Sequence, residues 1–453
     1  MKAAPEQATA ATTSALVASV RDLAWGAVPA DARVVARQCL LDFLGCAIAG
    51  AGDPLVDMLV AETAAREHAL EASLIGRDGR ATCASAALVN GAAAHALDYD
   101  DTHTTMMGHP SVPVLPAVLA LAELEDTTGR RMIEAFVAGF ELECRLGAVV
   151  GPAHYVAGFH PTATIGSFGA AAAAAHLLGL DEDGWLRALG LAGTGAAGLK
   201  VSFGTMAKPL HAGRAAASGV QSALLARRGF TASTSIVEAA QGFAATHDRA
   251  ADAAWLASMH GRFFVRETLF KHHAACYLTH ASIEAATRIR RAHDVEAGAV
   301  CDVEVRVAPT ALGVCNIAEP STGLELKFSL RGTTAMALLG EDTASPASFS
   351  DALAHDPRLR ALRNRVRVTA DAALAPTASV VVVTTPDGRF EEALDTGTAS
   401  DDLVEQGRRL ERKFRALSTP VLGEARSREI LAMVATIEDQ PRAAALLALT
   451  RPA

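Results

Sequence analysis

Aromatic residues are scarce in this sequence of 453 residues, because Phe, Trp and Tyr make up only 5% of a chain that is 50% hydrophobic. Alanine supplies the difference, and a chain this apolar is not disordered. Long hydrophobic runs are missing as well, since a membrane span needs about 20 strongly apolar residues. The stretch Gly169–Leu180 is rich in alanine and glycine and contains His176. We therefore expect a closely packed helical interior and no association with a membrane.

An excess of positive charge is also missing, because the formal net charge is −9. A protein that binds nucleic acid needs a basic face to pair with phosphates, so we expect no nucleic-acid partner. The seven cysteines are odd in number, widely spaced and without a CxxC pair. This pattern argues against a disulfide framework, a zinc ribbon or a cysteine-ligated cluster, and it favours buried thiols in a reducing cytoplasm.

Three common sequence templates are missing too. The chain has no GxGxxG motif in a βαβ setting, no GxxxxGK[ST] motif and no GxSxG motif between a strand and a helix. Dinucleotide, nucleotide and serine-hydrolase chemistry are therefore not expected. The N-terminal residues Met1–Thr13 have no strongly apolar core, so we interpret them as a frayed tail and not as a signal peptide.

From Ser14 to about Phe270, apolar residues recur every three or four positions, which predicts helices almost throughout. Alanine suits such a region because it has the highest helix propensity and lets helix axes approach closely. Several of the helices end at a glycine or a glycine-containing turn. The predicted helices are Asp31–Ile48, Pro113–Leu124, Arg131–Val150, Thr162–Leu178, Gly184–Leu191 and Leu210–Arg228.

The pattern changes after about residue 298. Val300–Val307 alternates between apolar and polar residues, which predicts a half-buried strand, and Ser379–Leu394 predicts a hairpin around Pro386-Asp387-Gly388. Further helices are predicted at Gly332–Leu339, Ser350–Leu353, Leu403–Ala416 and Arg426–Val434. The fold class is therefore mainly α: a large all-helical domain over residues 14–270 and 400–453, and a smaller α+β domain over residues 271–399.

Histidine is the first residue to consider for chemistry, because it titrates near neutral pH. Eight of the 15 histidines fall in four short polar segments, and the first segment contains His95, His103 and His109. Here an alanine-rich helix runs into the acidic sequence DYDD, although carboxylates oppose the dipole at a helix C-terminus. Such a local conflict often marks a functional site. A calcium loop or solvated charge is the alternative, but the alternating ligands of an EF-hand are absent.

The second and third segments both place a proline at the start of a helix. His160 precedes Pro161 at a helix N-terminus, where free backbone donors attract anions. Lys208, His211 and Arg214 lie together at another helix N-terminus, and their positive charge opposes the dipole there. A bound substrate carboxylate would resolve that conflict. A capping histidine and a solvated basic turn are the alternatives.

The fourth segment, KHHAACYLTH, begins at Lys271 and lies at the junction of the two predicted domains, where ligands often bind. It contains His273 and Cys276. A zinc site is the alternative, but no second close pair of ligands accompanies it.

These segments resemble the MmgE/PrpD family, which includes 2-methylcitrate dehydratases, cis-aconitate decarboxylases and iminodisuccinate epimerases. The resemblance covers residues 14–440 and rests on NGAAAHALDYDDTH, GHPSVPVLPAVLALAE, GFHPTATIGSFGAAAAAAHLLGL, AKPLHAGRAAASGVQSALLARRGFTA and KHHAACYLTHASIEAA, in that order. It implies a helical domain built from both chain ends, a smaller lid domain, a homodimer, and neither a metal nor an organic cofactor.

By position, the resemblance also implies roles for individual residues. The family's active-site aspartate and threonine fall on Asp98 and Thr102, its two histidines on His109 and His160, and its lysines on Lys208 and Lys271. His109 and His160 are the candidates for acid and base, and Lys208 is the candidate that stabilises negative charge. The predicted catalytic residues are therefore Asp98, Thr102, His109, His160 and Lys208. The predicted substrate-binding residues are His211, Arg214, Lys271, His273 and Cys276.

The reactions of the family all act beside a carboxylate of a compact polycarboxylate, which is the expected substrate. In the decarboxylase branch, the resemblance implies a histidine where this chain has Cys276 and a tyrosine near residues 314–316, where this chain has none. The sequence therefore favours a hydro-lyase similar to 2-methylcitrate dehydratase. An epimerase, a decarboxylase and a catalytically silent carboxylate-binding homologue are the alternatives.

Overall fold

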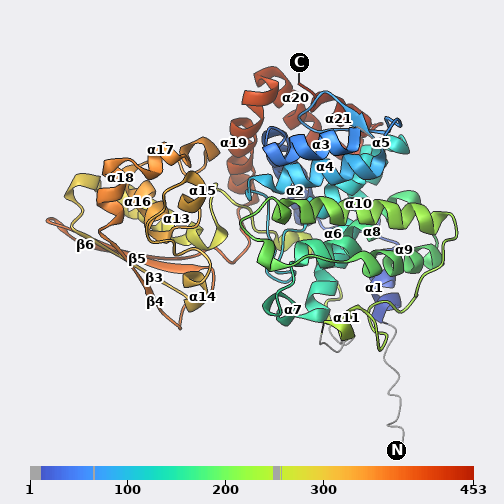
Figure 1. The fold of residues 1–453 in the computed structure, drawn as a ribbon, viewed down its shortest axis with the longest axis horizontal. Helices are drawn as coiled ribbons and strands as arrows, with labels where there is room; N and C mark the ends of the chain where they lie inside the picture. The colour runs from blue at the N-terminus through green and yellow to red at the C-terminus, as the bar shows by residue number, and fades with distance from the viewer. Residues whose placement is uncertain (1–11, 65–66, 248–255, 257, 453) are drawn as a thin grey trace, which may run out of the picture. The chain divides into compact units, whose positions relative to one another are not determined.

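The computed structural model describes residues 12–64, 67–247, 256 and 258–452, and Figure 1 shows its helices and strands. The chain divides into two units. Unit 1 takes its described residues from Met1–Ala96, Asp100–Thr268 and Asp402–Ala453, and unit 2 from Leu97–Tyr99 and Leu269–Asp401. The short segment Leu97–Tyr99 thus belongs to unit 2, although the chain on both sides of it belongs to unit 1.

Unit 1 is mainly helical. Its elements are α1 Thr12–Val20, η1 Trp25–Ala27, α2 Ala30–Gly50, α3 Pro54–Ala64, β1 Ala72–Ser73, β2 Arg80–Ala81, α4 Cys83–Ala96, α5 Ser111–Leu124, α6 Gly129–Val150, α7 Ala153–Val156, α8 Pro161–Leu178, α9 Glu182–Gly195, η2 Lys200–Ser202, α10 Ala207–Arg227, α11 Phe243–Thr246, η3 Phe264–Glu267, α19 Leu403–Leu422, α20 Glu424–Ala435, η7 Ile437–Asp439 and α21 Ala444–Leu449. The six helices predicted in this part of the sequence are present, each within a few residues of its expected bounds.

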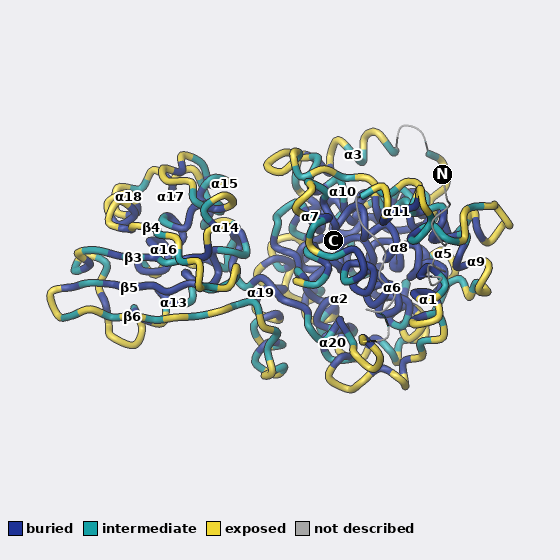
Figure 2. The backbone as a smooth tube through the Cα atoms, turned by 90° about the horizontal axis from the view of Figure 1, so that it is seen from below, coloured by how far each residue is buried: buried dark blue, intermediate teal, exposed yellow. Residues whose placement is uncertain are grey.

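Helix α8 lies at the centre of unit 1, where it contacts α5, α6, α9 and α10, and Figure 2 shows it among buried helices. Its run Ala170–Ala175 is buried. Small side chains let these helices approach closely, since a Cβ on Gly139 of α6 would lie 2.5 Å from the carbonyl oxygen of Gly169. The alanine content of the sequence is therefore the packing material of this core.

The last helices of the chain pack against the first ones in unit 1, as Figure 1 shows for α19–α21 beside α2–α5. A buried ion pair joins α19 to α2, because Lys413 Nζ lies 2.5 Å from Asp42 Oδ1. Breaking one partner of such a buried pair costs about 3–5 kcal/mol. The C-terminal segment is therefore a structural part of unit 1.

Unit 2 contains a four-stranded sheet and short helices. Its elements are η4 Tyr277–Thr279, α13 His280–Ala292, η5 Ala297–Ala299, β3 Asp302–Val307, α14 Pro309–Leu312, α15 Gly323–Leu326, α16 Leu330–Leu339, η6 Pro346–Ser348, α17 Asp351–Ala354, α18 Pro357–Arg363, β4 Val366–Ala370, β5 Ala378–Thr385 and β6 Gly388–Asp395.

The strand order of this sheet is β4-β3-β5-β6. The pair β3–β4 is parallel and the other two pairs are antiparallel. Helix α13 contacts β5 and β6, and α16 contacts β4. The hairpin predicted around Pro386-Asp387-Gly388 is present, with Thr385 opposite Gly388.

Three expectations from the sequence need correction. Ser14–Phe270 is not helical almost throughout, because β1 and β2 form a small sheet and residues 228–242 form turns and irregular structure. The predicted strand at Val300 begins only at Asp302, because η5 turns the chain just before it, so that Val300 is buried and Cys301 exposed. Within the predicted tail, residues 1–11 lie outside the described residues, but Thr13 is buried in α1 and its hydroxyl donates to Glu238.

Six of the seven cysteines are buried and Cys301 is exposed, and none of the seven forms a disulfide bond. Among the described residues no single helix is long and apolar enough to cross a bilayer. Only α2 together with residues 54–63 reaches that length and composition, and the chain bends by 86° between the two helices.

Candidate functional site

Two helices of unit 1, α4 and α10, touch through their backbones. A Cβ added to Gly213 of α10 would lie 2.1 Å from the carbonyl oxygen of Leu88, and one on Gly91 of α4 would lie 2.9 Å from Gly213 Cα. His95 follows Gly91 by about one helical turn, and His211 precedes Gly213 by two residues. The close crossing therefore brings the end of α4 near the start of α10.

At the end of α4, a buried carboxylate lies between two histidines. His95 Nδ1 lies 2.9 Å from Asp100 Oδ1, and His109 Nδ1 lies 2.9 Å from Asp100 Oδ2. His109 Nδ1 also lies 2.7 Å from the carbonyl oxygen of Asp101. Carboxylate and carbonyl oxygens only accept hydrogen bonds, so both Nδ1 atoms carry a proton and donate it. In the neutral rings the lone pair therefore lies on Nε2.

Burial decides the charge of these groups. Burial lowers the pKa of His95 to about 4, although Asp100 acts in the opposite direction. Burial alone would raise the pKa of Asp100, but the two imidazoles together outweigh it and hold this pKa well below its usual range. At neutral pH the group therefore consists of an ionised Asp100 and a neutral His95.

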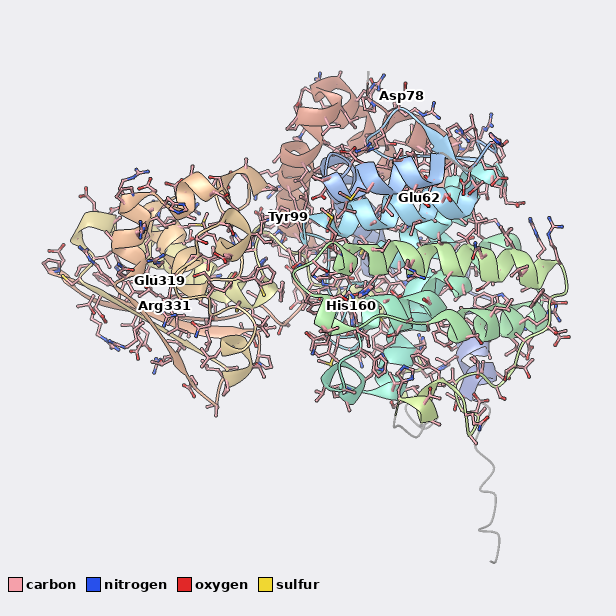
Figure 3. All side chains as sticks on the ribbon, in the orientation of Figure 1. Glu62, Asp78, Tyr99, His160, Glu319 and Arg331 are labelled. Atoms are coloured by element: carbon pink, nitrogen blue, oxygen red, sulfur yellow. The ribbon has the colours of Figure 1, made fainter. Side chains whose placement is uncertain are left out.

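His160 lies at the N-terminal end of α8 and is labelled in Figure 3. Its Nδ1 lies 3.1 Å from Nδ1 of His211, so one ring donates this hydrogen bond and the other accepts it. Burial, His95 and Lys208, in that order, lower the pKa of His160 strongly. The rings of His95 and His160 are stacked with their centroids 5.9 Å apart. The ring centroid of His95 also lies 4.6 Å from that of His109, so His95 is a neighbour of both predicted catalytic histidines.

Lys208 supplies positive charge beside these rings. It lowers the pKa of both His95 and His160, and its Nζ lies 5.3 Å from the ring centroid of Phe203. Arg214, one turn after His211 on α10, is exposed but still lowers the pKa of His211 after burial, the largest cause. We call His95, Asp100, His109, His160, Lys208 and His211 the histidine cluster.

Two polar residues of the first segment serve the local fold. Thr102 Oγ1 donates to the carbonyl oxygen of Gly108 across the loop between α4 and α5. His103 is buried, its Nε2 lies 3.0 Å from the carbonyl oxygen of Phe264, and its Nδ1 accepts from the N–H of Thr105. The His103 ring therefore ties this loop to η3.

The other predicted residues lie in unit 2. Lys271 is only 2% exposed, and its Nζ lies 2.9 Å from Asp98 Oδ1 and 2.6 Å from the carbonyl oxygen of Asp98. Asp98 has a φ of 50°, a left-handed conformation that is uncommon for residues other than glycine. Such local strain persists where surrounding contacts hold it, and the two bonds from Lys271 are contacts of that kind.

Cys276 is buried near this ion pair. A hydrogen bond with Cys315 lowers the pKa of the Cys276 thiol, although burial raises it. Of the ion pair, Asp98 raises this pKa and Lys271 lowers it. His273 uses both ring nitrogens within unit 2, since Nδ1 lies 2.8 Å from Thr343 Oγ1 and Nε2 lies 3.1 Å from Glu284 Oε1. We therefore assign His273 to the packing of unit 2 and omit it from the proposed substrate contacts.

Seven of the ten predicted residues thus fall into two groups, one in each unit. The histidine cluster holds His109, His160, Lys208 and His211, and a second group holds Asp98, Lys271 and Cys276. Sequence reasoning did not select His95 and Asp100 as site residues. The available signal was their position: both lie in the first polar segment, five residues apart across the end of a helix.

His95, Asp100 and His109 are residue types that bind metal ions, and their ligand atoms lie within 4.8 Å of one another. In this structure both Nδ1 atoms are hydrogen-bonded to Asp100. A cation could bind at these two Nδ1 atoms only after their protons had left.

Comparison with known proteins identifies two matching domains. Residues 14–256 match the MmgE/PrpD N-terminal domain, and residues 273–439 match the MmgE/PrpD C-terminal domain. A human protein named cis-aconitate decarboxylase is 28% identical over 90% of this chain and 88% of its own length. The mouse protein of the same name is 27% identical over 89% and 86%. That of Aspergillus terreus is 30% identical over 64% of this chain and 62% of its own length.

Proposed function

Because this chain belongs to the MmgE/PrpD family, we propose that it is a lyase that acts on a small polycarboxylate by moving a proton beside a carboxylate. The observation that supports this proposal is the histidine cluster, in which neutral imidazoles lie next to a lysine. Removal of a proton beside a carboxylate needs a neutral base and a positive charge that stabilises the enolate-like intermediate. The cluster contains both.

In the proposed reaction His109 and His160 carry protons. The Nδ1 proton of His109 is held by Asp100 and the Asp101 carbonyl, so Nε2 is the nitrogen that takes a proton. His160 and His211 share one hydrogen bond between their Nδ1 atoms, so in the neutral pair one Nε2 carries a proton and the other a lone pair. Lys208 stabilises the negative charge that develops on the substrate.

Unit 2 has a different part in the proposal. Lys271 binds a substrate carboxylate, in exchange for or in addition to its pairing with Asp98. Cys276 lies beside this lysine and contacts the same substrate. The family resemblance implies that unit 2 is a lid domain and that the chain forms a homodimer, and both are included in the proposal.

For the reaction itself we propose dehydration of a hydroxy-tricarboxylate similar to 2-methylcitrate. The specific observation is Cys276, which stands where the resemblance implies a histidine in the decarboxylase branch, together with the absence of tyrosine from residues 314–316. Decarboxylation of cis-aconitate is the second candidate, because the human and Aspergillus terreus relatives carry that name. Both reactions begin from the same class of substrate.

The decisive experiment incubates the purified protein with 2-methylcitrate, citrate, cis-aconitate and iminodisuccinate. Enoate absorbance, released CO2 and optical rotation then distinguish dehydration, decarboxylation and epimerisation. We expect enoate formation from a hydroxy-tricarboxylate. Release of CO2 from cis-aconitate would establish the second candidate. If every substrate fails while tricarboxylates still raise the melting temperature, the chain is a carboxylate-binding homologue and the proposed activity is wrong.

A further inference from the structure

We infer that Asp100 is a positioning residue that fixes His95 and His109 as a pair, and that His95 is an additional site residue whose Nε2 accepts a hydrogen bond from the substrate. The inference rests on the proposed function for the identity of the substrate. The inference goes beyond the proposed function because neither His95 nor Asp100 is among the residues that the family resemblance implies. The structural part of the inference can be tested without any substrate.

The first observation is the shared carboxylate. Both rings donate their Nδ1–H to Asp100: His95 Nδ1 lies 2.9 Å from Oδ1 and 3.0 Å from Oδ2, and His109 Nδ1 lies 2.9 Å from Oδ2. Asp100 is 1% exposed, so water does not compete for these bonds. A carboxylate that accepts from Nδ1 fixes both the tautomer and the orientation of an imidazole, as in hydrolase triads. Here one carboxylate does this for two rings.

The second observation is an unsatisfied nitrogen. Among the described residues, His95 Nε2 is a buried side-chain atom without a hydrogen-bond partner, and His95 as a whole is 1% exposed. Leaving a buried polar atom unpaired destabilises the folded protein, because the atom has lost its hydrogen bonds to water. Buried polar groups of native proteins are rarely left so, and the exceptions need an explanation. A substrate that supplies the missing donor is the explanation that we propose.

The surroundings of His95 support this explanation. Its ring centroid lies 4.6 Å from that of His109 and 5.9 Å from that of His160, so it is a neighbour of both proposed proton carriers. Because its Nδ1 donates to Asp100 and the ring is neutral, Nε2 offers a lone pair and no proton. An ionised polycarboxylate has no donor on its carboxylates. A hydroxyl or an N–H beside them is the group that Nε2 would accept from.

Two variants of His95 separate a substrate contact from a structural role. In His95→Asn the amide N–H replaces Nδ1–H and keeps the bond to Asp100, but the acceptor at Nε2 is lost. In His95→Gln the longer side chain places an amide oxygen near the position of Nε2, but the bond to Asp100 is lost. We expect kcat/KM to fall on the order of 10²-fold in His95→Asn and less in His95→Gln. Wild-type kcat/KM in His95→Asn, or a larger loss in His95→Gln, would overturn the role of Nε2.

The positioning role of Asp100 has a spectroscopic test that needs no turnover. In protein labelled with ¹⁵N-histidine, we expect Nδ1–H tautomers at His95 and His109 at neutral pH, and the signal of His95 disappears in His95→Asn. Asp100→Asn presents one amide oxygen and one NH₂ group to two Nδ1–H donors. At least one ring must then change its tautomer or its bond, and kcat should fall with little change in KM. The neighbouring variant Asp101→Asn is the matched control and keeps both tautomers.

The outcomes distinguish this inference from the proposed function. An Nε2–H tautomer at either position, or a charged His95 ring, in the wild-type protein would overturn the inference, whatever the enzyme catalyses. Unchanged histidine signals in Asp100→Asn would do the same. If the expected tautomers are found but no polycarboxylate is turned over, the positioning role of Asp100 stands and the proposed function is wrong.

Discussion

The two groups of polar residues, one in each unit, handle charge in opposite ways. In the histidine cluster of unit 1, burial and nearby positive charge keep His95, His160 and His211 neutral. In unit 2, Lys271 and Asp98 form a close ion pair. Both groups lie among buried side chains, so solvent exposure does not explain the difference. The chemistry of the side chains explains the difference, because a buried imidazole gives up its proton, whereas a buried lysine with an adjacent carboxylate stays paired.

This difference suggests a division of labour. Neutral imidazoles can accept and return protons near neutral pH, so the cluster in unit 1 is suited to the proton-transfer step. An ion pair is suited to recognising a carboxylate, which can replace or join the carboxylate already present. Each prediction below removes one element of this comparison, from the largest expected effect to the smallest.

The largest effect is expected for His160→Gln in the histidine cluster. Loss of a proton carrier should lower kcat on the order of 10²–10⁴-fold, with the melting temperature nearly unchanged. Steady-state kinetics and thermal unfolding measure the two quantities. His68→Gln is the matched control, because His68 is exposed in unit 1. Full activity in His160→Gln would remove His160 from the proposed mechanism.

A smaller and different effect is expected for Lys271→Met in unit 2. Loss of a charge-assisted hydrogen bond of about 1.5–3 kcal/mol should raise KM roughly 10- to 100-fold, with a smaller change in kcat. Lys327→Met, a half-buried lysine of the same unit, should leave both constants unchanged. A large fall in kcat at constant KM in Lys271→Met would contradict the division of labour, because it would place the lysine in the chemical step.

Gly213→Ala tests the helix contact that supports the histidine cluster. The added methyl group would lie 2.1 Å from the carbonyl oxygen of Leu88, so α10 must shift away from α4. We expect a loss of about 1–3 kcal/mol in the free energy of unfolding, measured by denaturant titration, and lower activity. In the control Gly26→Ala in η1, no heavy atom of the described residues lies within 4 Å of the added Cβ. That variant should be as stable as the wild type or more stable.

The smallest effect concerns the pH dependence of stability. Burial first, and then the nearby Asp42, raise the pKa of Asp101 to about 7. A carboxyl whose pKa is raised on folding stabilises the protein at low pH, and this contribution is lost as the pH rises through about 7. Because this carboxyl loses its proton near pH 4 in the unfolded chain but near pH 7 in the folded protein, we expect the wild-type melting temperature to fall over this range more steeply than that of Asp101→Asn. Equal slopes would show that Asp101 is not protonated in the folded protein.

Much of the fold was predictable because its signals are local. The helical spacing predicted α2, α5, α6, α8, α9 and α10, and the alternation and turn residues predicted β3 and the β5–β6 hairpin. The parallel pairing of β3 with β4 was not predicted, since it joins residues about 60 positions apart. The start of β3 was placed two residues too early, because η5, which precedes it, has no comparable signal.

The candidate site was predictable in part. Its polar segments are conspicuous in an alanine-rich chain, so His109, His160, Lys208 and Lys271 were found from the sequence and the family resemblance. His95 and Asp100 were not selected, because their significance depends on which atoms face each other. His273 was selected for its position in a polar segment, yet both of its ring nitrogens have partners within unit 2.

By itself, the sequence determined the family, the mainly helical fold and the polar segments that contain the candidate chemistry. These properties depend on residue order, on periodicity and on the small size of alanine and glycine. Only the tertiary structure decided which histidines are neutral, which nitrogen of each ring carries a proton, and that Asp100 lies between two rings. The reason is physical: a pKa and a tautomer depend on burial and on hydrogen-bond partners, and folding brings both together from distant parts of the chain.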